Sequence, residues 1–212
     1  MVAVPTRDRR AERREAVTAE ILEAAWDVAR SEGLAGLSLR DVAQRIGMRP
    51  PSLYWYFASK NAIYDAMFAQ GNRQLLQRLA EQDWPSDPRA ILRLGARAFI
   101  EFSMEDVQRY QLLFQRTIPN FEPSEEAFAI AVQVLDDMRV RIAKAGVITE
   151  AAFDTWTAIV SGLAAQQIAN DPTGDRWIRL IDDVTEMYLE HTLPAQSTLK
   201  ATSKSTPKRK AR

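Results

Sequence analysis

The fold of this chain is decided by the stretch from Ser38 to Lys60, which reads SLRDVAQRIGMRPPSLYWYFASK. Ser38 is a residue type that commonly caps a helix N-terminus, and the residues after it repeat apolar side chains at helical spacing: Leu39, Val42, Ala43 and Ile46. Gly47 then stands where a helix ends in a left-handed residue, and Pro50 and Pro51 fit the first turn of a second helix. The pattern predicts two short helices joined by a tight turn, a helix-turn-helix.

The second predicted helix is rich in aromatic residues. Leu53 and Phe57, four residues apart, form its buried stripe, and Tyr54, Trp55 and Tyr56 lie between them. Three consecutive helical positions point in three directions, so these aromatic side chains cannot all enter a core. An exposed surface of the kind that helix-turn-helix proteins place in a DNA groove is therefore favoured over ordinary core aromatics.

This segment resembles the DNA-binding motif of the tetracycline-repressor (TetR/AcrR) family of bacterial transcription regulators. The resemblance is carried by Ala43 followed four residues later by Gly47, by the pairs Leu53-Tyr54 and Tyr56-Phe57, and by Ser59-Lys60 at the start of the next helix. Two later segments, RYQLLFQRTIPNFEPSEEAF (109–128) and WTAIVSGLAAQQ (156–167), resemble the regulatory domains of actinobacterial members of the same family. That second match is more divergent, so the fold carries over from it better than a ligand does.

The resemblance implies which residues touch DNA. Eight positions match those where family members contact it: Arg40, Arg49, Pro51, Ser52, Tyr54, Trp55, Tyr56 and Lys60. Arginine can pair with guanine N7 and O6, and a proline or aromatic edge can pack on a thymine methyl group. Ser52, Tyr56 and Lys60 suit phosphate oxygens, which fix register without reading sequence. The family often has a small residue where Arg49 stands and a polar one where Pro50 stands, so base reading is expected to depend more on Arg40 and Arg49.

The composition excludes several classes of enzyme. The 212 residues include no cysteine and one histidine, His191, which we expect to be a solvated helix-end residue. Cysteine nucleophiles, disulfides, paired-histidine zinc sites and most serine–histidine triads are therefore excluded, and no catalytic residue, metal or cofactor is expected. The N-terminus lacks the apolar run of a signal peptide and no apolar stretch is long enough to cross a bilayer, so we expect a cytoplasmic protein without membrane contact.

The charge is zero in total but unevenly distributed. Residues 1–60 hold 10 Lys and Arg against 8 Asp and Glu, residues 61–193 hold 12 against 20, and residues 194–212 hold 6 against none. We expect three parts: a DNA-binding domain with a basic N-terminal arm (1–60), a helical regulatory and dimerisation domain (61–193), and a disordered basic tail (194–212). The arm is either a frayed, solvated terminus or a segment that follows DNA.

The periodicity predicts an all-α fold of about nine helices, with no alternating strand pattern and no internal repeat. The helix before the motif should end at Gly33, and a long helix should run from Lys60 to about Gln82, where two prolines follow. Further helices are expected over 89–104, 107–116, 124–145, 149–170 and 175–191, with Ser124 and Thr149 as N-terminal residues and Gly146 as a terminator.

Aromatic residues of the body are candidates for a ligand pocket, because pockets in helical domains lie between helices and are mostly apolar. For any one of them, ordinary core packing is the better-supported alternative. The resemblance implies an inducer cavity formed mainly by the helices between Asn61 and Ala145, and the apolar inventory favours a hydrophobic or amphipathic small molecule. The candidates are Phe68, Phe99, Phe102, Tyr110, Phe114, Phe128 and Trp156.

The last two predicted helices are dense in small residues, which let helices approach closely. Packing within the chain is one explanation; the resemblance implies a two-fold dimer interface of four helices instead. Dimerisation is also expected physically, because one short reading helix binds weakly and two half-sites add through a high effective concentration. The candidate interface residues are Ala158, Ser161, Gly162, Leu163, Ala165, Ile178, Ile181 and Val184.

Three functional classes follow. The favoured one is a sequence-specific DNA-binding transcriptional regulator, a homodimeric repressor that a hydrophobic small molecule releases from a palindromic double-stranded operator. The alternative is a DNA-binding regulator without a small-molecule effector, or an activator. A helical enzyme that happens to contain a helix-turn-helix is remote, because the histidine and cysteine chemistry is missing.

Overall fold

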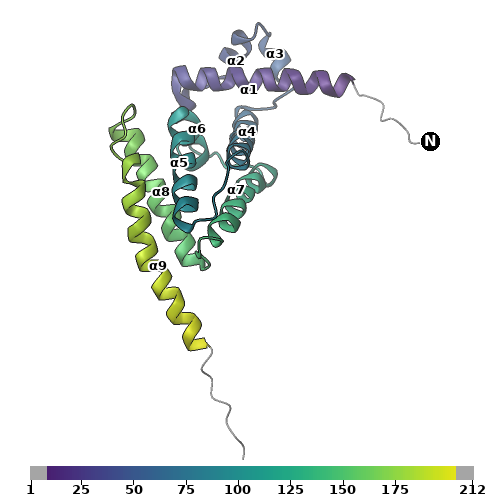
Figure 1. Cartoon of the computed structure of the whole chain (residues 1–212). Helices are drawn as coiled ribbons and strands as arrows, with labels where there is room; N and C mark the ends of the chain where they lie inside the picture. Colours follow the sequence, from purple (N-terminus) through teal and green to yellow (C-terminus); the bar gives the residue numbers. More distant parts are fainter. Residues whose placement is uncertain (1–8, 204–212) are drawn as a thin grey trace, which may run out of the picture. The chain divides into compact units, whose positions relative to one another are not determined.

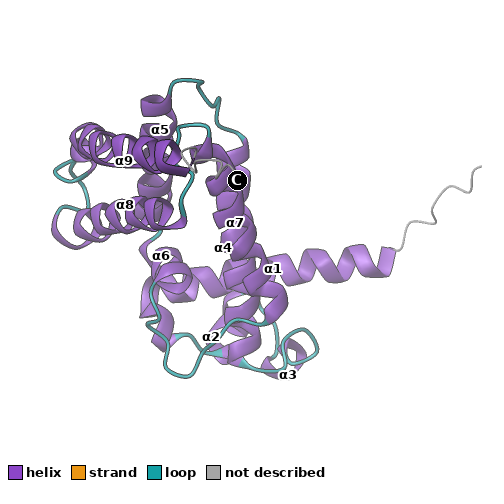
Figure 2. Cartoon of the chain, turned by 90° about the horizontal axis from the view of Figure 1, so that it is seen from below, coloured by secondary structure: helices purple, strands orange, loops and turns teal. Residues whose placement is uncertain are grey.

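The computed structural model describes residues 9–203, with side chains through residue 192. Within this range the regular elements are all helical, which confirms the expected fold class (Figures 1 and 2). In chain order they are α1 (Arg9–Gly36), α2 (Leu39–Arg45), α3 (Pro50–Leu53), α4 (Lys60–Ala80), α5 (Pro88–Glu105), α6 (Val107–Phe114), α7 (Glu125–Ala143), α8 (Glu150–Asn170), the 3-10 helix η1 (Ile178–Leu180) and α9 (Ile181–Ser203).

The chain divides into two compact units. The first comprises Met1–Gln74 and Asp106–Val132, and the second comprises Leu75–Glu105 and Gln133–Arg212. The first unit is larger than the predicted DNA-binding domain because α6 packs against α1. Asp106, only 8% exposed, joins them: its carboxylate accepts from the Arg30 guanidinium at 2.9 Å and caps α6 by accepting from the Arg109 N–H at 3.0 Å. Helices α4 and α7 each begin in the first unit and end in the second.

The helix-turn-helix has the local geometry that its sequence predicts. Ser38 caps α2, with its Oγ accepting from the Asp41 N–H at 3.2 Å. Gly33 (φ 76°) breaks the helical path of α1, and Gly47 (φ 67°) follows α2, so both glycines adopt the left-handed conformation that other residues rarely enter. In Figure 1, α2 and α3 lie together on one side of α1.

The core of the first unit combines the stripes predicted on α1, α2 and α3. Ile21, Val42 and Leu53 are fully buried, together with Ile63 and Met67 of α4. Polar pairs tie α1 to α4 around this core: the Trp26 indole N–H donates to Gln70 Oε1 at 2.7 Å, and the Tyr64 hydroxyl donates to the Leu34 carbonyl. These bonds join residues 44 and 30 positions apart in the chain and hold α1 against α4.

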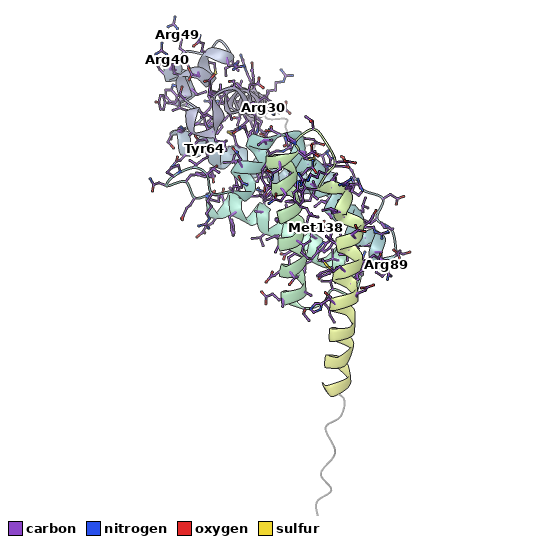
Figure 3. The ribbon with its side chains drawn as sticks, turned by 90° about the vertical axis from the view of Figure 1, so that its left-hand side faces the viewer. Arg30, Arg40, Arg49, Tyr64, Arg89 and Met138 are labelled. Carbon is purple, nitrogen blue, oxygen red and sulfur yellow. The ribbon has the colours of Figure 1, made fainter. Side chains whose placement is uncertain are left out.

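In the second unit, α5 packs against both α8 and α9, which run side by side in Figures 1 and 2. Glu186 of α9 accepts from Arg89 and Arg93 of α5 at 2.8 Å each. Gln167 is fully buried and fixes the α8–α9 connection: its Oε1 accepts from the N–H groups of Trp177 (2.8 Å) and Ile178 (3.1 Å). The close approach of α5 and α7 is visible at Gly95, where a Cβ would come within 2.8 Å of the Met138 methyl group (Met138 and Arg89 are labelled in Figure 3).

The last helix departs from its prediction. η1 begins at Ile178 and α9 runs to Ser203, whereas we expected one helix over 175–191 and a disordered tail after Pro194. The turn 171–174 is prolonged by the Gln167 hydrogen bonds, which hold the chain until Ile178. Within the predicted tail, the backbone to Ser203 is helical, and residues 204–212 lie outside the described residues, as does Arg7 of the arm. None of the described helices is both long and apolar enough to cross a membrane.

Candidate nucleic-acid interface and ligand groove

The reading helix is shorter than its sequence pattern predicts. It ends at Leu53, and Tyr54, Trp55 and Tyr56 form a hydrogen-bonded turn instead of a further helical turn. The Trp55 N–H donates to the Ser52 carbonyl at 3.3 Å and the Tyr56 N–H to the Leu53 carbonyl at 2.9 Å, two bonds that span three residues. The Phe57 N–H donates to the same Leu53 carbonyl at 3.0 Å and closes the turn. Leu53 and Phe57 are nevertheless both buried, as predicted.

The aromatic residues of this turn mostly face outward. The exposed fractions are 82% for Trp55 and 55% for Tyr54, so neither is a core residue of the chain. Arg40, Arg49 and Pro51 are also exposed, and Figure 3 shows Arg40 and Arg49 at the same outer end of the first unit, beyond Tyr64. We call the surface formed by these five residues, with Ser52 and Tyr56, the reading surface.

Three predicted phosphate-contacting residues are more enclosed. Ser52, Tyr56 and Lys60 are half-buried. The Lys60 ammonium donates to the Ala35 carbonyl at 2.8 Å and lies 5.4 Å from the Tyr64 ring centroid, so it also anchors the start of α4 to the end of α1. An ammonium group has three donors, which leaves this internal bond compatible with the predicted phosphate contact.

A residue of the arm reaches this surface, which the sequence did not reveal. Arg14 Nη2 donates to the Trp55 carbonyl at 3.4 Å, and its guanidinium carbon lies 5.7 Å from the centroid of the Tyr56 ring. Forty-one residues separate Arg14 from Trp55, and no local pattern pairs positions so far apart. The arginine-rich composition of the arm was the only available signal.

The predicted ligand residues do not form one site. Phe68, Phe114 and Phe128 line a groove of about 340 Å³ in the first unit, with walls from α4, α6, the segment that joins α6 to α7, and the start of α7. Tyr110 is buried in the same unit with its ring 5.8 Å from that of Phe114. Phe99, Phe102 and Trp156 belong to the second unit, where Phe102 and Trp156 are buried; the Trp156 ring packs 5.0 Å from that of Tyr188.

The groove has residues that periodicity did not suggest, because they lie in a loop. Ile118, Phe121 and Pro123 complete its apolar wall, and Phe121 packs edge-on against Tyr64 with 5.5 Å between ring centroids. The loop end is fixed to α4, since the backbone N–H and the hydroxyl of Ser124 donate to the Asp65 carboxylate at 2.6 and 2.8 Å. Phe114 and Phe128 remain 40% and 53% exposed, so the groove is open to solvent.

The candidate dimer residues separate into three groups by exposure. Ala158 and Gly162 are exposed on α8, and no atom lies within 4 Å of a Cβ built at Gly162. Ser161, Ala165, Ile178 and Val184 are half-buried. Leu163 (8% exposed) and Ile181 (fully buried) pack inside the chain, because they sit on the sides of α8 and α9 that face the rest of the second unit. These two residues are therefore core residues of one chain.

The reading segment and its flanking helices are similar in sequence to known proteins. Residues 21–67, from the middle of α1 into α4, match the sequence model of a family described as bacterial regulatory proteins, tetR family. The chain is 36% identical over 83 residues to the class A tetracycline repressor protein from transposon 1721 of Escherichia coli, which covers 37% of this chain and 36% of that protein.

Two further similarities extend beyond that segment. The HTH-type transcriptional regulator Rv1816 of Mycobacterium tuberculosis is 28% identical over 184 residues, which is 83% of this chain and 65% of that protein. The crystal structure of PfmR, a TetR family transcriptional regulator from Thermus thermophilus, superposes with a TM-score of 0.59 at 20% identity, over 80% of this chain and 97% of that one. The chain thus spans between about a third and two thirds of the length of these two sequence relatives, and the structural likeness concerns the fold.

Proposed function

We propose that the chain is a member of the TetR family of bacterial regulatory proteins and a homodimeric, sequence-specific DNA-binding regulator of transcription that acts as a repressor. The observation that carries the proposal is the division of the Ser38–Lys60 segment into a buried and an exposed set. Its apolar stripe is in the core, whereas Arg40, Arg49, Tyr54 and Trp55 are exposed. The same family membership argues against an enzyme.

Arginine and aromatic side chains together are suited to base edges and thymine methyl groups in a major groove. One reading surface covers few base pairs, so specific binding needs two copies placed about 34 Å apart, one helical turn of DNA. We propose that the exposed small residues of α8, Ala158 and Gly162, lie at the interface that joins the two copies, with the outward side of α9 beside them.

The DNA-binding proposal is tested by selecting fragments from a random double-stranded DNA pool with the purified protein and sequencing those retained. We expect a palindromic consensus whose half-sites are about one helical turn apart. The same consensus should shift protein in a 1:2 ratio of duplex to chains. Enrichment of no consensus, with equal affinity for all fragments, would contradict the proposal and would favour a helical enzyme or a non-specific binder.

We further propose that the groove lined by Phe68, Phe114 and Phe128 takes a hydrophobic or amphipathic small molecule that weakens DNA binding. Its lining residues are mostly apolar, and the polar ones are Gln115, Arg116, Thr117 and Glu122. A volume of about 340 Å³ suits a compact ligand and is at the lower end for small-molecule sites. Phe68 stands on α4, the helix that begins at Lys60 beside the reading surface, so a ligand that shifts Phe68 acts on the same helix.

Coupling of this kind is reciprocal. A ligand lowers DNA affinity only if it prefers a conformation that binds DNA poorly, and a tenfold effect corresponds to about 1.4 kcal/mol of coupling free energy. Consensus DNA must then weaken the ligand by the same factor. This requirement separates the proposal from the alternative regulator without an effector, in which a molecule occupying the groove leaves DNA affinity unchanged.

The groove is tested with the apolar fluorescent probe 1-anilinonaphthalene-8-sulfonate. We expect the probe to bind the parent protein and to bind Phe128→Ser much more weakly, since Phe128 is a half-exposed groove residue whose loss costs little folding free energy. Val140→Ser is the matched control, because Val140 is an exposed apolar residue (64%) that does not line the groove. Equal probe binding by all three proteins would place the apolar site elsewhere.

A further inference from the structure

A cleft of about 420 Å³ lies within the first unit, between the first turns of α1 and the reading surface. We call it the arginine cleft, because three of its lining residues are arginines of α1. The residues that line it are Arg10, Arg13, Arg14, Met48, Ser52, Trp55 and Tyr56. In Figure 1, α3 lies beside the N-terminal half of α1, which runs past the rest of the unit. The cleft therefore joins the arm to the turn that carries Trp55 and Tyr56.

The three arginines reach the cleft because of their spacing in a helix. Positions 10, 13 and 14 are three and four residues apart, so their side chains share one face of α1. Arg14 faces inward to the turn: it donates to the Trp55 carbonyl at 3.4 Å and lies 5.7 Å from the Tyr56 ring centroid. It is thus placed to hold the turn in position, while Arg10 and Arg13 stand nearer the start of the helix.

The lining is electrically one-sided. Among the described residues that form the cleft, three are cationic and none is a carboxylate. Guanidinium groups present forked donors that match the oxygens of a phosphate, and the Ser52 hydroxyl adds a further donor. Trp55, 82% exposed, supplies a flat apolar surface on which a deoxyribose of a DNA strand can pack. Cationic donors beside an apolar plane suit the phosphate oxygens and the sugar of a DNA backbone.

We propose that the arginine cleft is a phosphodiester subsite that holds a DNA strand beside the bases contacted by the reading surface. Arg13 and Arg10 contact the phosphate, and Arg14 is a positioning residue that fixes the Trp55–Tyr56 turn. The proposal rests on the DNA-binding function proposed above and adds a distinct role for the arm. Phosphate contacts carry no sequence information, so the subsite should raise affinity equally for all sequences.

The test is the salt dependence of DNA binding by Arg13→Gln and by the double variant Arg10→Gln, Arg13→Gln. Each neutralised phosphate contributes about 0.9 to the slope of log affinity against log salt concentration. Since a homodimer carries the change twice, Arg13→Gln should reduce the slope by about 1.8. Its affinity should fall by the same factor on consensus and on scrambled DNA. Arg73→Gln removes an equal charge from an exposed position on α4 outside the cleft and should leave the slope unchanged.

Arg14→Gln should behave differently, because it acts through the turn. We expect it to lower the ratio of consensus to scrambled affinity, an effect that loss of a phosphate contact alone would not produce. Thermal unfolding of all variants should match the parent, since these side chains lie on an exposed helix.

Two results would overturn the inference while leaving the DNA-binding function intact. In the first, the parent protein selects a consensus, but the slope of log affinity against log salt concentration is as unchanged in Arg13→Gln as in Arg73→Gln. The other is a loss in Arg13→Gln confined to consensus DNA, which would make Arg13 a base contact. If the parent selects no consensus and shows no salt-dependent affinity, both the proposed function and this inference are wrong.

Discussion

The helix-turn-helix and helix α8 differ in how clearly each separates its inward from its outward residues. In the first, Val42, Ala43 and Leu53 are buried, and Arg40, Arg49 and Trp55 are exposed, as their spacing predicts. In α8, one set of candidate surface residues divides: Ala158 and Gly162 are exposed, while Leu163 is buried. A helix with charged residues on one side identifies its own faces, whereas a helix that is small or apolar all round does not.

This difference makes α8 the place where a substitution has the largest expected effect on DNA binding. Ala158→Glu puts a charge on the exposed side of α8, where we place the dimer interface. Burying an unpaired carboxylate there should dissociate the dimer and lower affinity for consensus DNA by at least about a hundredfold, because the two half-sites no longer add. Sedimentation velocity should show monomers.

Ala80→Glu, at the exposed end of α4, is the control and should remain dimeric. Intact dimers of Ala158→Glu with parental DNA affinity would move the interface away from this side of α8. The contrast between the two regions would then disappear, since the exposed residues of α8 would have no partner.

On the buried side of α8, a substitution is expected to lower the stability of the fold and not to disrupt the dimer. Leu163→Ala should lower the free energy of unfolding by about 2–5 kcal/mol, because it leaves a cavity where α8 meets its own chain. Thr155→Ala, an exposed change on α8, should stay within about 0.5 kcal/mol of the parent in a urea titration. A dimeric chain of unchanged stability in Leu163→Ala would contradict the burial seen here.

Substitutions on the reading surface should spare stability and reduce affinity to a smaller degree. Arg40→Ala, Arg49→Ala and Tyr54→Ala should each cost about 1–3 kcal/mol on consensus DNA, or roughly 5- to 150-fold. Their melting temperatures should equal that of the parent, because all three side chains are exposed. Parental affinity in all three variants, measured by fluorescence anisotropy, would mean that the exposed side of the helix-turn-helix does not read bases.

The smallest effect is expected at Tyr188, which joins α9 to α8. Its hydroxyl donates to the Ala152 carbonyl at 2.7 Å, and burial raises the pKa of Tyr188, a shift that the hydrogen bond with Thr192 partly offsets. The neutral phenol is thus favoured in the fold. The contribution of the neutral phenol to the free energy of unfolding is fully present below the unfolded pKa of about 10, and it is lost as pH rises through the higher folded pKa.

Tyr188→Phe should therefore lower the free energy of unfolding by about 1 kcal/mol at pH 8. It should also make that free energy less sensitive to pH above about 10. Tyr54→Phe, at an exposed tyrosine, should change neither quantity. If the free energy of unfolding of Tyr188→Phe still fell with pH above about 10 as it does in the parent, another group would control stability in that pH range.

The groove shows why part of the candidate site was not predictable. Phe68, Phe114 and Phe128 were candidates because they are aromatic residues at helical spacing, but so were Phe102 and Trp156, which pack in the second unit. Periodicity predicts which face of its own helix a residue lies on, but it does not predict which other helix packs against that face. Ile118 and Phe121 escaped notice because the loop that holds them is positioned by Ser124 and Asp65, which are 59 residues apart.

The sequence by itself determined the helical class, the approximate bounds of the helices from α4 to α8, the turn at Gly47 and the exposed residues of the reading surface. Those features depend on caps, glycine conformation and residues within one or two turns, which are local and legible in a single chain. Tertiary structure alone decided that α6 joins the first unit through Arg30 and Asp106, that Arg14 holds the Trp55 turn, and that Leu163 and Ile181 face inward. Each of these is a choice among long-range contacts of similar chemistry, and only the packed chain distinguishes them.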